Sequence, residues 1–234
     1  MAIERHDDYL VDRDLDGVVS IGIESAKLAE CVTEVSRRGA RGVFGAPCFG
    51  FAQSDLDFLA RLPSLQKIWF WDVALSNVDA IYSLPDLRYF GVHPRRPAMS
   101  FDRLPTLETV IWKHNPRDRG LSSLAHLSKL HVWNYKPRHG TFAGLELAPN
   151  IRELQLNWAN PKSLAGLPEL PHLKHLQISR CRNLESIAEL PRIAPQLEHL
   201  VVSTCGRVAD GRAVVQHLPK LRHAFVRDEV LVTR

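Results

Sequence analysis

Histidine is the residue type whose spacing in this chain most directly suggests chemistry, because imidazole binds metals and exchanges protons near neutral pH. His175, His199 and His223 follow one another at intervals of 24 residues, in segments of similar sequence. Three imidazoles side by side could bind zinc at a site with an open position, or could make a surface whose charge changes with pH. Duplicated repeats produce the same ladder without any function. The sequence leaves these alternatives open and predicts neither a metal site nor a cofactor.

Signatures of known catalytic sites are missing from the sequence. It contains no H-E-x-x-H, no phosphate-binding loop, no G-x-S-x-G and no glycine-rich dinucleotide turn. The glycines of the segment FGAPCFGF (44–51) do not have a phosphate-binding spacing and predict tight turns instead. We therefore expect a protein that is not an enzyme, with no catalytic residue and no small-molecule substrate.

The composition is that of an ordinary globular protein, with 45% hydrophobic and 24% charged residues in 234. The charged segment at the beginning of the chain has no apolar run long enough for a signal peptide, and the run 17–23 is too short to cross a membrane. These features predict a cytoplasmic protein without a membrane partner.

The net charge of +4 is unevenly distributed. Residues 1–60 hold 6 Lys/Arg and 11 Asp/Glu, whereas residues 88–139 hold 10 Lys/Arg and 3 Asp/Glu. A basic middle region favours an anionic partner and speeds encounter with it, although a solvated surface explains the same charges.

A repeat runs through most of the chain and must position all of these residues. One copy reads LPHLKHLQISRC from Leu170, and another reads LAHLSKLHVWNY from Leu124. We number each repeat from its anchor residue as position 1. The anchors are Leu65, Leu87, Leu107, Leu127, Ile151, Leu173, Leu197 and Leu221. Positions 4 and 6 are apolar and alternate with variable residues, which predicts strands with one buried face.

These segments resemble the LxxLxLxx(N/C) core of the leucine-rich-repeat family, over roughly residues 40–234, with a degenerate first copy from Ala40. The resemblance implies an α/β fold: a curved leucine-rich-repeat solenoid with a parallel β-sheet on its concave face and short 3₁₀ or irregular segments on its convex face. Cys48, Cys181 and Cys205 fall at position 9, where the family uses Asn or Cys to satisfy the turn backbone. Since no C-x-x-C pair occurs, we expect reduced, structural cysteines.

The whole chain, 1–234, is predicted to be a single domain. Residues 1–39 should form an N-terminal cap, with a strand over 17–23 and a helix that begins at Ser25 as N-cap and ends at Arg38, burying Cys31 on its apolar stripe. The repeats should occupy 40–205, and 206–234 should hold the last repeat and a C-terminal cap with a helix over 211–217 and a strand over 229–233.

Aromatic and basic residues at the outward positions 3, 5, 7 and 8 are the strongest candidates for binding. Trp112 falls at a buried position, whereas four of the five tryptophans should be exposed, and exposed Trp often anchors protein interfaces. The alternative is that these rings pack together and close the face. The concave candidates are Lys67, Trp69, Trp71, Tyr89, His93, Lys113, His114, His131, Trp133 and Trp158.

A second candidate band lies in the loops that follow three neighbouring strands. These loops are rich in arginine and should form one basic rim, although loops are commonly polar without any role in binding. The rim residues are Arg95, Arg96, Arg117, Arg119, Arg138 and His139.

Together these patterns favour a protein-interaction module that binds an acidic protein partner. By architecture alone the chain resembles small bacterial leucine-rich-repeat proteins, some of which act as immunity proteins that block a toxin. One alternative is a nucleic-acid-binding protein that uses the basic rim and the exposed rings, in which case affinity would fall steeply with salt. The other is a structural scaffold without a dedicated partner. The sequence does not determine the oligomeric state.

Overall fold

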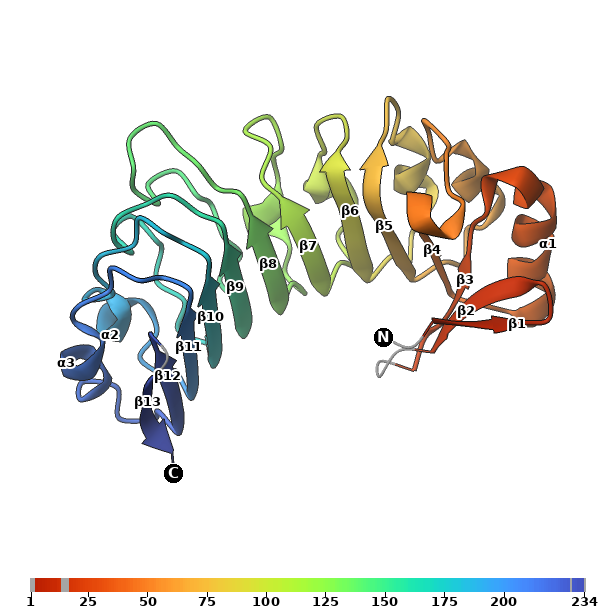
Figure 1. The fold of residues 1–234 in the computed structure, drawn as a ribbon. Helices are drawn as coiled ribbons and strands as arrows, with labels where there is room; N and C mark the ends of the chain where they lie inside the picture. Colours follow the sequence, from red (N-terminus) through yellow and green to blue (C-terminus); the bar gives the residue numbers. More distant parts are fainter. Residues whose placement is uncertain (1–2, 14–16, 228, 234) are drawn as a thin grey trace. The chain divides into compact units, whose positions relative to one another are not determined.

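A computed structural model describes residues 3–13, 17–227 and 229–233 of the chain (Figure 1). They form two compact units. The first comprises residues up to Val110 together with Arg117–Arg119, and the second comprises Ile111–Pro116 and the chain from Gly120 onward. The organisation of the chain as one domain, with a cap over 1–39 and repeats over 40–205, stays a prediction.

The first unit is built on six strands that pair in chain order. The strands β1 and β2 make an antiparallel hairpin, β2 also runs antiparallel to β3, and β3 to β6 are parallel. Their bounds are β1 Ile3–His6, β2 Tyr9–Arg13, β3 Val19–Gly22, β4 Gly42–Gly45, β5 Lys67–Ala74 and β6 Tyr89–Arg95. The strand predicted over 17–23 is confirmed as β3, whereas the hairpin before it was not anticipated.

The helix of the N-terminal cap is α1, Leu28–Arg38, preceded by a 3₁₀ turn over Ser25–Lys27. Its apolar stripe buries Cys31, as predicted, and Gly39 ends it in the left-handed conformation at φ 60°. The prediction that Ser25 caps the helix is wrong. Its hydroxyl instead accepts a hydrogen bond of 2.7 Å from the backbone N–H of Ala52, so that it ties the cap to the following loop.

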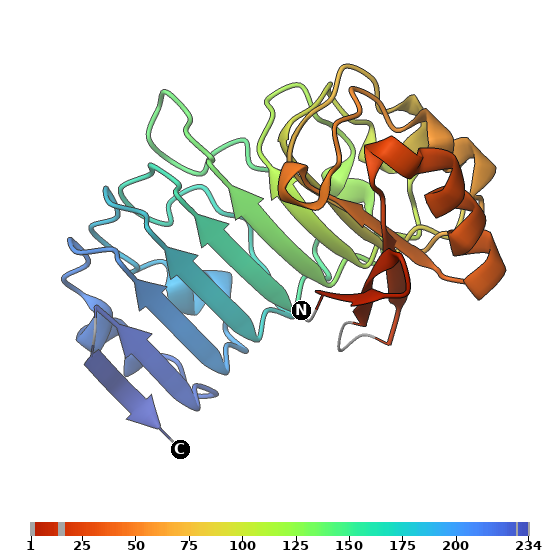
Figure 2. The same ribbon diagram turned by 45° about the vertical axis from the view of Figure 1, so that its right-hand side comes forward.

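The second unit holds five parallel strands and a final antiparallel one, seen side by side in Figures 1 and 2. They are β8 Lys129–Trp133, β9 Glu153–Asn157, β10 His175–Ser179, β11 His199–Ser203, β12 His223–Val226 and β13 Glu229–Thr233. The strand β7, Thr109–Lys113, contains the boundary between the units. Two short helices, α2 Leu190–Ile193 and α3 Gly211–Val215, lie in the connections. The C-terminal helix and strand are therefore present as predicted.

The repeat accounts for the core of each unit. The anchors and the residues at positions 4 and 6 point inward; Leu65, Leu87, Leu173 and Leu197, for example, are completely buried. The connections between strands are short 3₁₀ helices at Asp57–Arg61, Asp79–Ser83, Phe101–Arg103 and Leu121–Ser123. Each contributes buried apolar side chains such as Leu59 and Ile81, so successive repeats share one core. The predicted leucine-rich-repeat solenoid with short 3₁₀ connections is confirmed.

Two of the three position-9 cysteines act as the family resemblance implies. The backbone N–H of Cys181 donates to Sγ of Cys205 over 3.3 Å, and both thiols lie close to backbone carbonyl oxygens of the preceding strands. Both residues are buried, and all four cysteines are free. Cys48 differs, because it is exposed on a 3₁₀ turn, Pro47–Phe49, that replaces the usual strand end.

The described part of the chain holds no helix that is long and apolar enough to cross a membrane.

Candidate protein-binding faces

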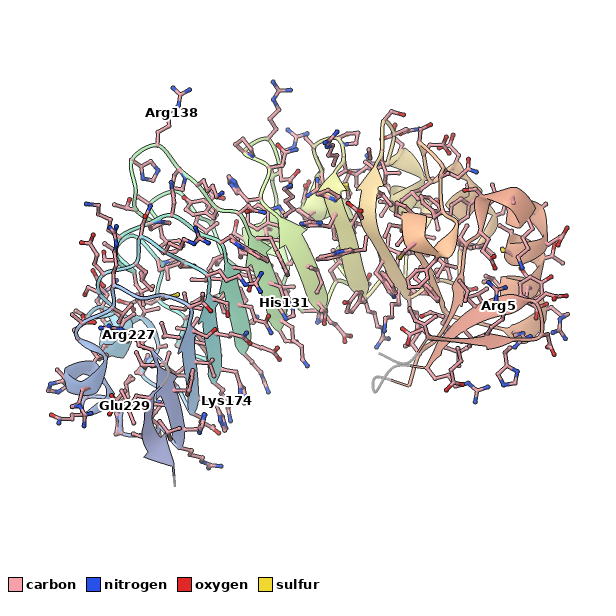
Figure 3. All side chains as sticks on the ribbon, viewed as in Figure 1. Arg5, His131, Arg138, Lys174, Arg227 and Glu229 are labelled. Carbon is pink, nitrogen blue, oxygen red and sulfur yellow. The ribbon has the colours of Figure 1, made fainter. Side chains whose placement is uncertain are left out.

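The face that carries the odd repeat positions, here called the strand face, is the candidate surface in each unit. In β8, Leu130 and Val132 are buried, whereas the alternating residues Lys129 and His131 are exposed and half-buried, respectively. The same alternation runs through β9, β10 and β11, because successive side chains of a strand point to opposite sides of the sheet. Figure 3 shows His131 on this face.

Two tryptophans and an arginine form a cluster at the ends of the strands of the second unit. The rings of Trp133 and Trp158 lie 5.0 Å apart with a tilt of 36°, and the guanidinium of Arg180 stands 4.6 Å from the Trp158 ring centre. Trp158 and Arg180 both occupy position 8 and adopt positive φ angles of 52° and 58°. This unusual backbone turns both side chains out of the strand pleat at one place. Arg180 is exposed, whereas Trp133 and Trp158 are half-buried, so the prediction that these two tryptophans are exposed is wrong. The cluster presents aromatic area and a cation together, which is typical of interface hot spots.

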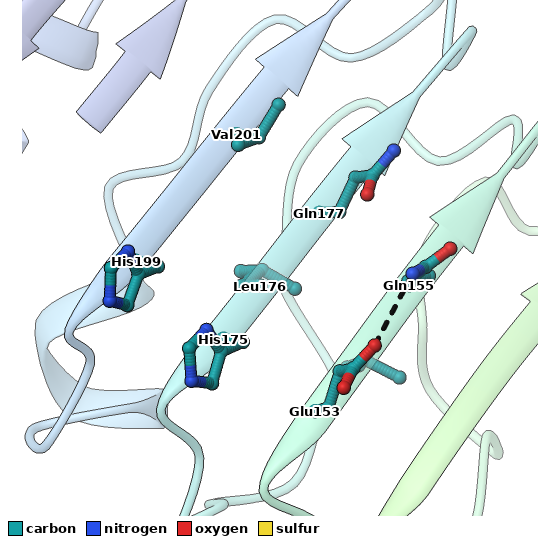
Figure 4. A pocket seen from close by; sticks show the side chains of 8 residues that line it. Glu153, Gln155, His175, Leu176, Gln177, His199 and Val201 are labelled. Atoms are coloured by element: carbon teal, nitrogen blue, oxygen red, sulfur yellow. Dashed lines mark hydrogen bonds between the residues drawn. The ribbon is translucent and has the colours of Figure 1, made fainter. Parts of the chain in front are cut away.

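A pocket of about 220 Å³ lies further along the same face, toward the beginnings of β9, β10 and β11 (Figure 4). Its polar lining consists of Glu153, Gln155, His175, Gln177 and His199. The imidazoles of His175 and His199 are stacked with centroids 4.6 Å apart and planes within 6°. His223 continues the ladder at 6.4 Å.

Ion pairs at one side of this pocket set its charge. The Glu153 carboxylate lies 3.4 Å from Lys129 Nζ and 3.5 Å from His131 Nε2. Although burial acts to raise the pKa of Glu153, the two neighbouring nitrogens outweigh it and lower that pKa. Burial lowers the pKa of His131 despite the attraction of Glu153. This part of the face therefore has a fixed carboxylate and a neutral imidazole at pH 7.

Within the histidine ladder, the surroundings of His199 favour its uncharged form. Burial is the largest influence that lowers the pKa of His199, followed by the neighbouring imidazole of His175. Glu198 opposes this shift only partly. Among the residues that the structure describes, no three His, Cys, Asp or Glu side chains converge closely enough to hold a metal ion. The zinc alternative therefore finds no ligand set within these residues.

The remaining candidates of the second unit lie in different environments. His114 packs edge-on against Trp112 and Tyr135, at 5.2 and 4.8 Å, and is half-buried, as is Lys113 on β7. Trp112 is buried, as predicted. Arg138 is exposed and extends from the loop after β8 (Figure 3).

In the first unit, two predicted surface residues prove to be buried. Lys67 is 1% exposed and Trp69 is 7% exposed, so the prediction that they lie on an open face is wrong. The Trp69 ring stacks on Phe44 at 4.9 Å with planes within 8°, and Phe49 covers its edge. Lys67 lies along the Tyr89 ring, with Nζ 5.0 Å from the centroid. The rings of Phe44 and Phe49, in the degenerate first copy of the repeat, and of Tyr89 in the next strand fill this face.

The end of the first strand face is open to solvent. Trp71 is exposed, and its ring stacks on His93 at 4.3 Å with planes within 10°. Arg95 beyond it is also exposed. The prediction that Trp71 lies on the surface is confirmed, and His93 beside it is half-buried.

Arg96 does not belong to the basic rim. Its side chain is 3% exposed and forms a bidentate ion pair with Asp118 at 2.9 and 2.5 Å. Asp118 also accepts a hydrogen bond of 2.7 Å from the backbone N–H of Met99. This contact joins two loops of the first unit, so it is structural. Arg117 and Arg119 are exposed, and the guanidinium of Arg119 donates to the Ser100 hydroxyl.

The prediction omitted residues that complete the second-unit face. Arg180, Gln177 and the stacked pair His175 and His199 were not among the predicted binding residues. The signal that could have found Arg180 is its place at position 8, which it shares with Trp158 in the preceding repeat.

Comparison with known proteins agrees with this geometry at the level of the fold. The sequence matches no protein-family profile and no curated protein. The structure is similar to that of an internalin, InlF, from Listeria monocytogenes, with a TM-score of 0.54 and 15% sequence identity. The similarity covers 93% of this chain and 69% of the internalin chain. The chain therefore has the leucine-rich-repeat fold.

Proposed function

We propose that the protein is a non-enzymatic interaction module that binds a protein partner on the strand face of its second unit. The observation that carries this proposal is the cluster of the half-buried Trp133 and Trp158 with the exposed Arg180, because tryptophan and arginine side by side supply a large share of the binding energy in many interfaces. Repeat solenoids use extended sheet faces of this type for binding.

The charges on and around this face favour an acidic partner. Arg180 and Arg138 are exposed cations at or near the cluster, Lys129 is an exposed cation at the beginning of β8, and Glu153 is partly neutralised by its ion pair with Lys129. Cations at the edge of an interface steer an acidic surface toward the aromatic centre and raise the association rate. In the first unit, the exposed Trp71–His93 stack, together with Arg95 and Arg117, is a second candidate face.

A more specific form of the proposal is an immunity protein that acts in the bacterial cytoplasm and blocks a toxin. Inhibition would be steric, because the partner's active site would be covered by the strand face. The excess of basic over acidic residues after residue 60 suits a toxin with an acidic cleft better than a basic nuclease.

Binding of nucleic acid is the second candidate, and the exposed arginines of the loops support it. Single-stranded nucleic acid stacks on aromatic rings flanked by cations, as Trp158 and Arg180 are arranged. The buried Arg96–Asp118 pair weakens this candidate, because it removes one cation from the basic rim. A scaffold without a dedicated partner would need neither the Trp cluster nor the rim.

The experiment is affinity capture of partners from the native host with the wild-type chain and with the double variant Trp133→Ala/Trp158→Ala, each with and without nuclease. We expect one stoichiometric acidic protein that resists nuclease and is lost with the double variant. Trp71→Ala is the matched control, because it removes an exposed ring from the first unit only. Circular dichroism and cooperative unfolding verify that each variant is folded.

Three results would contradict the proposal. Capture that disappears with nuclease would assign the surface to nucleic acid. Retention by the double variant together with loss by Trp71→Ala would move the interface to the first unit. Unchanged capture by every folded variant would favour the scaffold.

A further inference from the structure

A cleft of about 530 Å³ lies at the edge of the second unit where β8, β9 and β10 begin. Figure 3 marks this edge through Lys174, which precedes β10, and Arg138 lies beyond the opposite ends of the strands. The cleft draws its side chains from three successive repeats, at the residue before each anchor and at position 2. They are Ala125, His126, Ser128, Asn150, Arg152 and His172.

Charged residues at position 2 normally pair with a neighbouring repeat. Arg88 lies 3.2 Å from Glu108 in the first unit. In the second unit, the Glu198 carboxylate forms ion pairs with Lys174 at 2.8 Å and with Arg222 at 3.9 Å. This row of surface ion pairs compensates each cation with a carboxylate of an adjacent strand.

Arg152 breaks this pattern. Its neighbours at position 2 are Ser128 and Lys174, so neither offers a carboxylate. Within the described residues, its guanidinium makes no hydrogen bond or ion pair. The carboxylate next to it in sequence, Glu153, points to the strand face and pairs with Lys129. Arg152 is therefore an uncompensated cation beside an already paired lysine.

The two histidines of the cleft can also bind a ligand. The side chains of His126 and His172 have no hydrogen-bond partner among the described residues, and both are exposed. The backbone around them is fixed, because Arg152 N–H donates to the Ser128 carbonyl over 2.8 Å and the Asn150 side-chain amide donates to the Ala125 carbonyl over 2.9 Å. A rigid edge thus presents a guanidinium and two imidazoles around one cleft.

We infer that this cleft binds a phosphate group, with Arg152 as its central ligand and His126 and His172 on either side. A guanidinium matches two phosphate oxygens in a planar, bidentate arrangement, and an imidazole N–H donates to an oxygen of the same group. The group could belong to free phosphate or to a phosphate monoester, which share this chemistry. The site is separate from the strand face, so the inference does not rest on the proposed function.

The test is a titration of the folded, full-length chain with inorganic phosphate, followed by the NMR signals of the histidine rings at constant pH and ionic strength. We expect the signals of His126 and His172 to shift along a saturating curve with a dissociation constant of about 1 mM, a typical affinity for a small anion at an open site. Arg152→Gln should weaken binding at least ~tenfold, which corresponds to about 1.4 kcal/mol. Phenyl phosphate, tested in parallel, distinguishes a monoester ligand from free phosphate by its tighter binding.

Arg88→Gln is the matched control, since it removes a cation at the same repeat position that is paired with Glu108. It should leave the phosphate titration unchanged. Shifts that do not saturate, equal shifts of histidines outside the cleft, or a normal titration of Arg152→Gln would overturn the inference. Acetate that binds as tightly as phosphate would also overturn it, because the site would then take carboxylates in general.

Discussion

The strand faces of the two units use the same repeat positions for opposite purposes. In the first unit, positions 3 and 5 of β5 hold Lys67 and Trp69, and both are buried. In the second unit, positions 3 and 5 of β10 hold His175 and Gln177, which are exposed or half-buried and line a pocket. The repeat thus determines which way a side chain points, while its neighbours determine whether solvent reaches it.

The side chains of the adjacent strands cause this difference in burial between β5 and β10. The strand β4 precedes β5 and carries Phe44 at the outward position 5, and Phe49 follows on a 3₁₀ turn. These rings cover Trp69 from two sides. Around β10, the corresponding neighbours are Gln155 and Val201, which are too small to close the face.

The largest expected effect is on Trp69. Trp69→Ala should lower the free energy of unfolding by about 4 kcal/mol, because it removes a stacked ring and leaves a cavity against Phe44. Trp158→Ala, at a half-buried position on the strand face, should cost less, about 1 kcal/mol. Urea denaturation of the two variants measures the contrast. Equal losses would mean that the two faces are equally closed, and the comparison would fail.

How much of this was predictable from the sequence depends on the range of the interaction involved. The strands, their register and the buried anchors follow from a period that is local and repeated many times, as at Leu173 and Leu197. The burial of Trp69 does not, because it depends on Phe44, which lies 25 residues earlier in a degenerate repeat. Likewise, Ser25 has the residue type of an N-cap, but the partner it takes is Ala52 of a distant loop.

The candidate site was predicted in part for the same reason. The sequence predicted Trp133 and Trp158 on one face, and the structure brings their rings together. Trp133 is at position 7 and Trp158 at position 8, so alternation alone would place them on opposite sides of the sheet. The positive φ of Trp158 turns its side chain toward the Trp133 ring instead. Loops do not follow the repeat period, so six arginine and histidine residues could only be assigned to a rim by proximity in sequence. Arg96 instead turns inward to Asp118, a partner 22 residues away in the next loop.

The second prediction compares this buried arginine with an exposed one. Arg96→Ala should lower the free energy of unfolding by about 3 kcal/mol, because it leaves the Asp118 carboxylate buried without its counter-charge. Arg138→Ala, on an exposed loop, should change it by about 0.5 kcal/mol or less. Thermal or chemical denaturation measures both values.

In partner binding, the substitution of Arg138 should have a larger effect than the substitution of Arg96. Arg138→Ala should slow association with an acidic partner, whereas Arg96→Met, in a chain that still folds, should not. A slower association of Arg96→Met with the partner would mean that Arg96 contributes to the basic rim, and the comparison would fail.

The smallest expected effect concerns pH and the histidine ladder. The pKa of His199 is lowered in the folded chain, mainly by burial and then by His175, so the folded state binds fewer protons than the unfolded state. Stability therefore rises with pH through the histidine range and falls as pH decreases from about 7 to about 5. His131, whose pKa burial also lowers, adds to the same slope.

The carboxylate with the strongest pKa shift, that of Glu34, does not contribute to the pH dependence of stability between pH 7 and 5. The pKa of Glu34, hydrogen-bonded first to Arg37 and then to Arg38, is about 2, so the stability that this carboxylate contributes is lost as the pH falls below the ordinary value of 4.5. His199→Asn should therefore reduce the slope of stability between pH 7 and 5, measured by denaturation at each pH. The control His217→Asn removes an exposed imidazole outside the ladder and should leave the slope unchanged. An unaltered slope in His199→Asn would mean that His199 is as well solvated in the folded chain as in the unfolded chain. Burial on the strand face of the second unit would then not control the charge of this imidazole.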